Sequence, residues 1–158
     1  MFLRTETITE KKIIGKRLTM SFAENTTGQL FASFMPRRNE IQNRANSDLL
    51  CVTNYPPGFF QGFSPTRPFE KWAAAEVTTD SAPAEMETMT IPGGEYAVFL
   101  FKGTPANAGP FFQNIFANWF PASGYVVDDR PHFDVLGSKY KNNDPESEEE
   151  IFIPVRKV

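Results

Sequence analysis

The predicted secondary structure of this chain follows one order twice, and this constrains the fold more than any other feature. Apolar residues alternate in some segments, as in strands, and recur at helical spacing in others. In the first half we predict a strand, a helix and two strands at 10–22, 23–43, 48–55 and 69–78. In the second half we predict two strand segments, a helix, a turn and strand, and a last strand at 86–103, 105–124, 125–137 and 150–158. A polar link at 79–85 separates the halves.

Two such β-α-β-β units predict an α+β fold. They are expected to pack as one domain over residues 1–158, with half-units of about 5–80 and 84–158. The strands would form a long antiparallel sheet with both helices on one face. The other face of the sheet, or the junction between the halves, is then available for a functional site.

Composition excludes several classes of protein. The net charge of −3 and the pI near 5.2 argue against direct binding of nucleic acid. A single cysteine, Cys51, makes no intrachain disulfide, and no apolar run reaches the length of a membrane span, so a cytoplasmic protein without a membrane partner is expected. With His132 the only histidine, zinc and haem sites lack ligands, and no metal, cofactor or catalytic residue is predicted.

Strand phase places acidic residues beside large apolar ones. Side chains alternate between faces, so Glu150 shares a face with Phe152, and Trp72 lies among acidic residues in its own strand. We interpret the preceding acidic stretch, 144–149, as a solvated turn. If the face of Asp134 converges with those of Glu150 and Trp72, the three strands line a cleft for a flat hydrophobic cation. In the alternative, the acids point to solvent and the aromatic rings are core.

Several motifs resemble those of the GyrI-like family, the effector-binding domain of AraC- and MerR-type regulators. They are Pro92 to Val98, Trp119 to Tyr125, Arg130 to Asp134 and Glu150 to Val155. The resemblance implies two β-α-β-β units related by a pseudo-twofold, with a ligand cleft between them. It also implies that aromatic residues and buried acids bind cationic, hydrophobic compounds. Asp134 falls where the family usually has Glu, which shortens that side chain by one methylene.

The expected ligand-binding residues combine these acids with aromatic and apolar neighbours. They are Glu150, Asp134, Trp72, Phe152, Trp119, Phe34, Met20 and Phe99.

Three functions remain open from the sequence. The leading hypothesis is a stand-alone small-molecule binder of multidrug type, acting in transcriptional or drug response, with a separate regulator as a further partner. The second is a hydrolase of strained electrophilic rings, with Asp134 and Glu150 as the acid pair. The third is an inhibitor module that contacts another protein through the phenylalanine-rich loop at 56–63.

Overall fold

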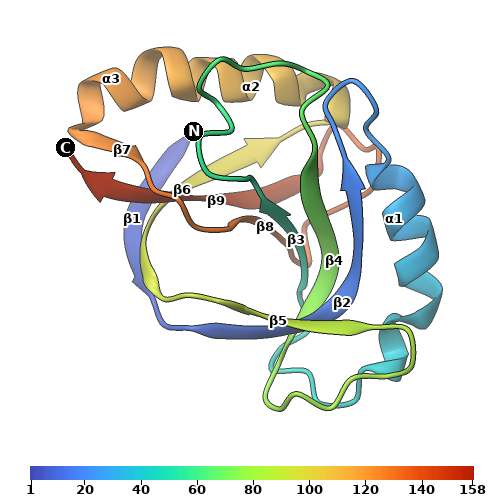
Figure 1. Ribbon diagram of the computed structural model, residues 1–158. Coiled ribbons are helices and arrows are strands. Elements are labelled where there is room, and N and C mark those ends of the chain that lie inside the picture. The colour runs from blue at the N-terminus through green and yellow to red at the C-terminus, as the bar shows by residue number, and fades with distance from the viewer.

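The computed structural model describes all residues, 1–158, as a curved antiparallel sheet with helices on its outer side (Figure 1). The strands are β1 (Phe2–Ile8), β2 (Lys11–Met20), β3 (Leu49–Asn54), β4 (Phe69–Val77), β5 (Glu87–Ile91), β6 (Gly94–Lys102), β7 (Tyr125–Val127), β8 (His132–Leu136) and β9 (Glu148–Lys157). The helical segments are α1 (Thr27–Phe34), η1 (Met35–Glu40), η2 (Pro105–Asn107), α2 (Ala108–Asn114), the π-helical η3 (Ile115–Trp119) and α3 (Phe120–Ser123). None of these helices is both long and apolar enough to cross a membrane.

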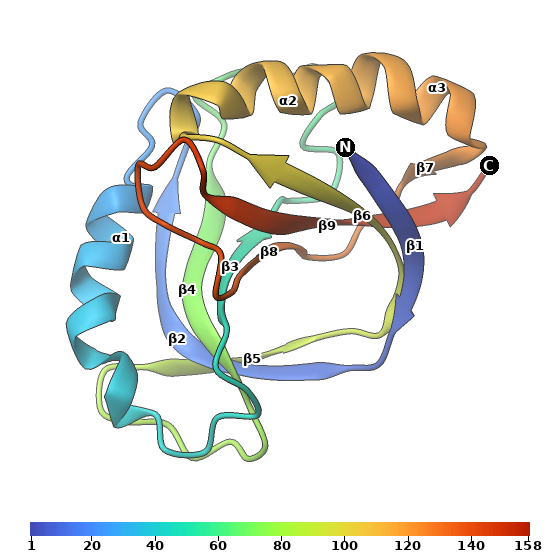
Figure 2. The same cartoon turned by 180° about the vertical axis from the view of Figure 1, so that it is seen from behind.

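The sheet is built from two equivalent halves. Its strand order is β1-β6-β9-β8-β3-β4-β2-β5, with β7 pairing to β9 outside this path. The first half contributes β3-β4-β2 and the second β8-β9-β6, so each half has the same internal order and the halves meet where β3 pairs with β8. The predicted α+β fold, with the helices on one face, is confirmed (Figures 1 and 2).

The two halves exchange their edge strands. β1 leads directly into β2 but pairs with β6 of the other half, and β5 leads into β6 but pairs with β2. The two short connections touch, since a Cβ on Gly93 would lie 3.0 Å from the carbonyl oxygen of Ile8. A side chain at this position would be in an unusually tight contact, so glycine favours the close approach. The exchange curls the sheet and gives it a concave and a convex face.

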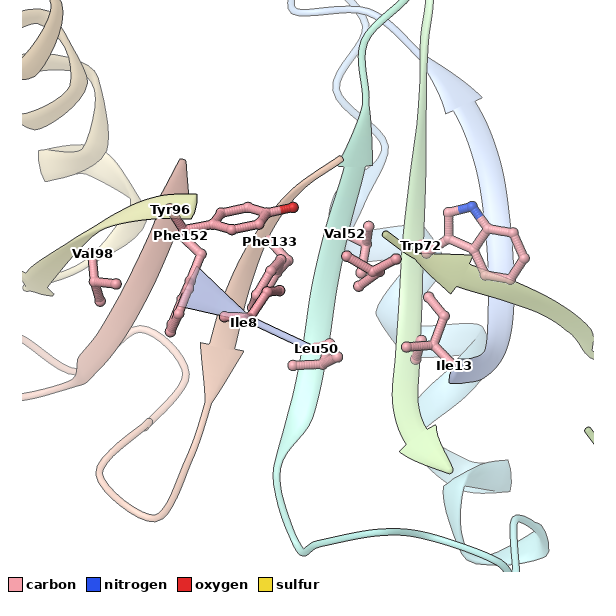
Figure 3. Packing of buried hydrophobic residues seen from close by; sticks show 11 residues of the cluster. Ile8, Ile13, Leu50, Val52, Trp72, Tyr96, Val98, Phe133 and Phe152 are labelled. Carbon is pink, nitrogen blue, oxygen red and sulfur yellow. The ribbon is translucent and has the colours of Figure 1, made fainter. Parts of the chain in front are cut away.

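The concave face is filled with apolar side chains from most of the strands (Figure 3). Its buried members are Ile8, Ile13, Leu50, Val52, Trp72, Ala74, Ile91, Tyr96, Val98, Phe133 and Phe152. On the convex face, α1 packs on one core and the helical run of α2 to α3 on another. The central strands are therefore covered on one face by side chains inside the curve and on the other, in part, by helices.

Local sequence signals explain the helix boundaries. In α1, Leu30 and Phe34 are four residues apart and both are buried against the sheet. Pro36 lacks the backbone N–H that a continued α-helix needs, and the chain passes into the 3₁₀ segment η1. The last helix, α3, ends at Gly124, whose φ of 78° is the left-handed conformation that glycine adopts readily.

Two expectations about local structure need correction. Residues 2–8 form a full strand, which the pattern of the sequence did not predict. The last strand begins at Glu148 rather than at residue 150, so Glu148 and Glu149 belong to β9 and not to a solvated turn.

Candidate functional site

The site is a strip of the convex face where the two halves meet, which we call the seam. It consists of the outward side chains of β3 and β8, between the two helix-covered cores. Directly opposed residues of antiparallel strands share a face. Cys51 lies opposite Asp134 and Thr53 opposite His132, so these four side chains line the seam.

The neighbouring strands add one acid and one cation to the seam. Glu149 precedes Ile151 by two residues in β9, and Ile151 is the cross-strand partner of Asp134, so Glu149 is on the same face. On the other side, Lys71 of β4 lies opposite Thr53. The seam therefore carries two carboxylates with a single ammonium group among its strand residues.

The two carboxylates are held in an environment that opposes their ionisation. Burial raises the pKa of Asp134, and the charge of Lys71 only partly offsets this. Burial also raises the pKa of Glu149, the charge of Asp134 raises it further, and Lys71 again acts in the opposite direction. Each carboxyl group thus makes ionisation of the other more costly.

Neither carboxylate has a charged partner. No ion pair of the structure includes Asp134 or Glu149. Lys71 instead donates a hydrogen bond of 3.1 Å to the hydroxyl of Thr27. A poorly solvated anion without a counter-ion is costly, and a bound cation would lower that cost.

Aromatic rings stand next to the acids. The Tyr55 ring contacts His132, which precedes Asp134 by two residues on the same face of β8. Burial raises the pKa of Tyr55, and the charge of Asp134 adds to the shift. The Tyr55 ring centroid lies 4.9 Å from that of His132 and 5.0 Å from that of Phe60. Phe60 in turn contacts Phe116 of η3 at 6.2 Å, so rings from both halves meet at this end of the seam.

The remaining titratable groups of the seam are held uncharged at neutral pH. Burial, with help from the charge of Arg130, lowers the pKa of His132 to about 4. Burial raises the pKa of the Cys51 thiol to about 12. Tyr140, in the connection between β8 and β9, has a raised pKa through burial and then through Glu149 and other acids of the seam. The net charge of the seam is therefore set by the two carboxyl groups and Lys71.

The predicted convergence of Asp134 with Glu150 and Trp72 is wrong. In the β8–β9 register Val135, not Asp134, lies opposite Glu150. Asp134 faces the convex side, whereas Glu150 lies on the side of Phe152 and Trp72, where its carboxylate pairs with Arg4 at 2.9 Å. The error arose because the concave side is itself a packed core. The apolar side chains of β8, Phe133 and Val135, therefore face this core and not the helices.

The same register separates the acid pair of the hydrolase hypothesis. Asp134 and Glu150 lie on opposite faces of the sheet, so they cannot act together on one substrate.

The other predicted site residues are divided among three cores. Trp72 and Phe152 belong to the concave core, Met20 and Phe34 to the core beneath α1, and Phe99 and Trp119 to the core beneath α2 and α3. None of these six residues lies on the seam strands β3 and β8. Their roles in ligand binding stay predictions.

Sequence reasoning missed the second carboxylate, Glu149, and the nearby Lys71 and Tyr55. For Glu149 a signal was present, since it alternates in phase with Ile151 and Ile153. Because Glu149 belongs to an acidic run, we interpreted it as part of a solvated turn and not as a strand residue. For Lys71 and Tyr55 the decisive information is the pairing of β3 with β4 and β8, which joins segments far apart in sequence.

Comparisons with known proteins agree with this architecture. The family model described as the GyrI-like small molecule binding domain matches residues 1–156. The transcriptional regulator BrlR of Pseudomonas aeruginosa is 25% identical over 147 residues, which cover 90% of this chain and 51% of BrlR. The chain thus spans about half the length of this curated relative.

Two solved structures share the fold. One is the C-terminal domain of EcmrR, with a TM-score of 0.70, 14% identity and 99% of both chains covered. The other is SAV2435 bound to tetraphenylphosphonium, with a TM-score of 0.67, 14% identity, and coverage of 99% of this chain and 94% of that one.

Proposed function

The chain belongs to the GyrI-like family of small-molecule-binding domains, and on this premise we propose that its seam binds a hydrophobic organic cation. The observation that carries the proposal is the pair Asp134 and Glu149, two neighbouring carboxyl groups without an ion-pair partner. A permanent cation would supply the missing counter-charge. An anion or a neutral compound would not.

The surroundings of the acids support the proposal that the ligand is hydrophobic. Tyr55, His132 and Phe60 form a continuous set of ring contacts that begins beside Asp134. Aromatic faces attract cations and bury large apolar areas. SAV2435, which has the same fold, has been solved with a lipophilic cation of this class, tetraphenylphosphonium.

A titration with tetraphenylphosphonium, followed by the fluorescence of Trp72 and Trp119, tests the proposal directly. Tetraphenylborate has nearly the same shape and the opposite charge, so it is the matched control ligand. We expect saturable binding of the cation and much weaker binding of the anion. Equal affinity for both would show that charge plays no part and would overturn the proposal.

Matched variants locate the binding site on the sheet. Asp134→Asn and Glu149→Gln are each expected to lower the affinity for the cation about tenfold or more, which corresponds to about 1.4 kcal/mol of binding free energy. Glu150→Gln removes the same charge from the opposite face and should change the affinity less than twofold. If Glu150→Gln were as damaging as Asp134→Asn, the ligand would not be bound at the seam.

A role in transcriptional or drug response is a further part of the proposal. BrlR is a transcriptional regulator, and this chain matches about half of it. We propose that the chain senses or sequesters its ligand and acts with a separate regulator protein. Ligand-dependent co-purification with a regulator from the native cell would support that role. The same yield with Asp134→Asn would speak against it.

A further inference from the structure

The concave face contains a small cavity on the side of the sheet opposite the seam. Its volume is about 90 Å³. Residues from six strands and from the segment before β3 line it: Glu6, Ile8, Lys11, Asn46, Asp48, Leu50, Glu76, Phe133, Val135 and Phe152. A water molecule occupies about 30 Å³ in the liquid, so the cavity has room for only a few non-hydrogen atoms.

The floor of the cavity is apolar. Phe133 and Phe152 stack with ring centroids 4.5 Å apart and an interplanar angle of 13°. Ile8, Leu50 and Val135 complete this surface, and Figure 3 shows Ile8 and Leu50 beside the two rings. Water at this apolar floor would have few hydrogen-bond partners, so a ligand with a short alkyl group could replace it favourably.

The mouth of the cavity is charged and predominantly acidic. Three carboxylates, those of Glu6, Asp48 and Glu76, line it together with the single ammonium group of Lys11. Lys11 pairs with Glu76 at 3.3 Å, and Glu6 pairs with Arg4 at 2.8 Å. Asp48 takes part in no ion pair of the structure, and the nearby guanidinium group of Arg44 donates a hydrogen bond of 3.2 Å to the Asp48 backbone carbonyl oxygen instead, so one carboxylate at the mouth has no direct ionic partner.

The arrangement does not suit a metal ion. The structure has no group of three or more His, Cys, Asp or Glu side chains placed to hold one. Apolar side chains also form the whole floor, where a hard cation would need oxygen ligands. The combination of an acidic mouth and an apolar floor matches an ion that is charged at one end and aliphatic at the other.

We propose that this cavity is a second binding site, which takes a small primary alkylammonium ion. The ammonium group meets Asp48 at the mouth, and the alkyl chain lies on the stacked rings of Phe133 and Phe152. The site is independent of the seam because β3 and β8 present different residues to the two faces. Leu50 and Val135 reach the cavity, whereas Cys51 and Asp134 face away from it.

The test uses the full chain and propylammonium as the probe, with 1-propanol and propionate as neutral and anionic controls of similar size. Methyl NMR signals of Ile8, Leu50 and Val135 report on the cavity, and that of Leu136 reports on the seam. We expect saturable shifts of the three cavity signals with propylammonium and at least threefold weaker binding of both controls. Equal response to 1-propanol, or shifts that never saturate, would overturn the proposal.

Two variants make the test specific. Asp48→Asn should lower the affinity for propylammonium at least threefold, and Leu50→Phe should abolish its binding by filling the cavity. Retained binding of tetraphenylphosphonium at the seam shows that a variant is folded; if Leu50→Phe does not fold, Asp48→Asn decides alone. Asp134→Asn should leave propylammonium binding unchanged, and its loss in that variant would mean that the probe binds at the seam.

Discussion

Lys71 and Glu149 occupy equivalent positions in the two halves, yet one is a cation and the other an acid. Each lies two residues before the residue that pairs with the centre of the seam: Ala73 pairs with Cys51, and Ile151 pairs with Asp134. The pseudo-symmetric fold thus presents an asymmetric charge pattern. The second half supplies both carboxylates of the seam, and the first supplies the only ammonium group.

Removing the ammonium group should improve the seam for a cation. In Lys71→Met the aliphatic bulk remains, but the charge that competes with a ligand for the two carboxylates is gone. We expect tetraphenylphosphonium to bind about three- to tenfold more tightly at pH 9, where both acids are ionised. Lys102→Met, which removes an exposed lysine paired with Glu146, is the control and should have no effect. Weaker binding by Lys71→Met would mean that Lys71 contacts the ligand favourably.

The stability of the unliganded protein should fall as the pH rises from about 4 to about 8. The pKa values of Asp134 and Glu149 are raised to about 7 and about 8, so the folded chain holds protons that the unfolded chain has already lost. The free energy of unfolding therefore decreases through this window. The decrease is steepest above about pH 6.5, because below that value the lowered pKa of His132 contributes a change of the opposite sign. Asp134→Asn should remove part of that decrease. At pH 9 the free energy of unfolding of this variant should be about 1–3 kcal/mol higher than that of the native chain. Urea unfolding at several pH values measures this, and parallel curves for the two proteins would contradict it.

Binding of a permanent cation should release protons near neutral pH. At pH 7 the two carboxyl groups are partly protonated, and a bound cation favours their ionised forms. The affinity should therefore rise between pH 6 and pH 8. Calorimetric titration in buffers with different ionisation enthalpies counts the protons released. The expected result is a release that disappears at pH 9, while a count of zero at pH 7 would place the ligand away from the acids.

The phenylalanine-rich loop should depend on one arginine for its shape. The guanidinium group of Arg67 donates hydrogen bonds to the carbonyl oxygens of Gly58, Phe59, Gln61 and Gly62. Lysine cannot reproduce this planar set of donors. We expect both Arg67→Ala and Arg67→Lys to raise amide hydrogen exchange at 58–63 by tenfold or more, with little change in β4. Full protection in Arg67→Lys would show that a single charge is sufficient.

The sequence predicted the fold well because the two halves repeat clear local signals. Alternation marked β2, β3 and β4, helical spacing marked α1, and Pro36 marked its end. β1 escaped detection because its side chains are mostly exposed, so it has little apolar alternation. Its place in the sheet depends on pairing with β6, which lies more than half the length of the chain away in sequence.

The site was harder to predict because both faces of the central strands are covered. Alternation within the strand correctly grouped Glu150 with Phe152. It does not determine which residues of the neighbouring strand lie on the same face of the sheet. That relationship is fixed by the register of β8 against β9, which placed Asp134 with Glu149 instead. The resemblance to the GyrI-like family pointed to Asp134 and, in the last strand, to Glu150 rather than to Glu149.

The exchange of β1 and β5 has a consequence for how the chain is made. When the first half leaves the ribosome, β2 lacks the edge strand that β5 will supply, and β1 has no partner until β6 has been synthesised. The seam pairing of β3 with β8 must wait longer still. The newly made first half therefore exposes open strand edges and depends on the rest of the chain, or on a chaperone, to cover them.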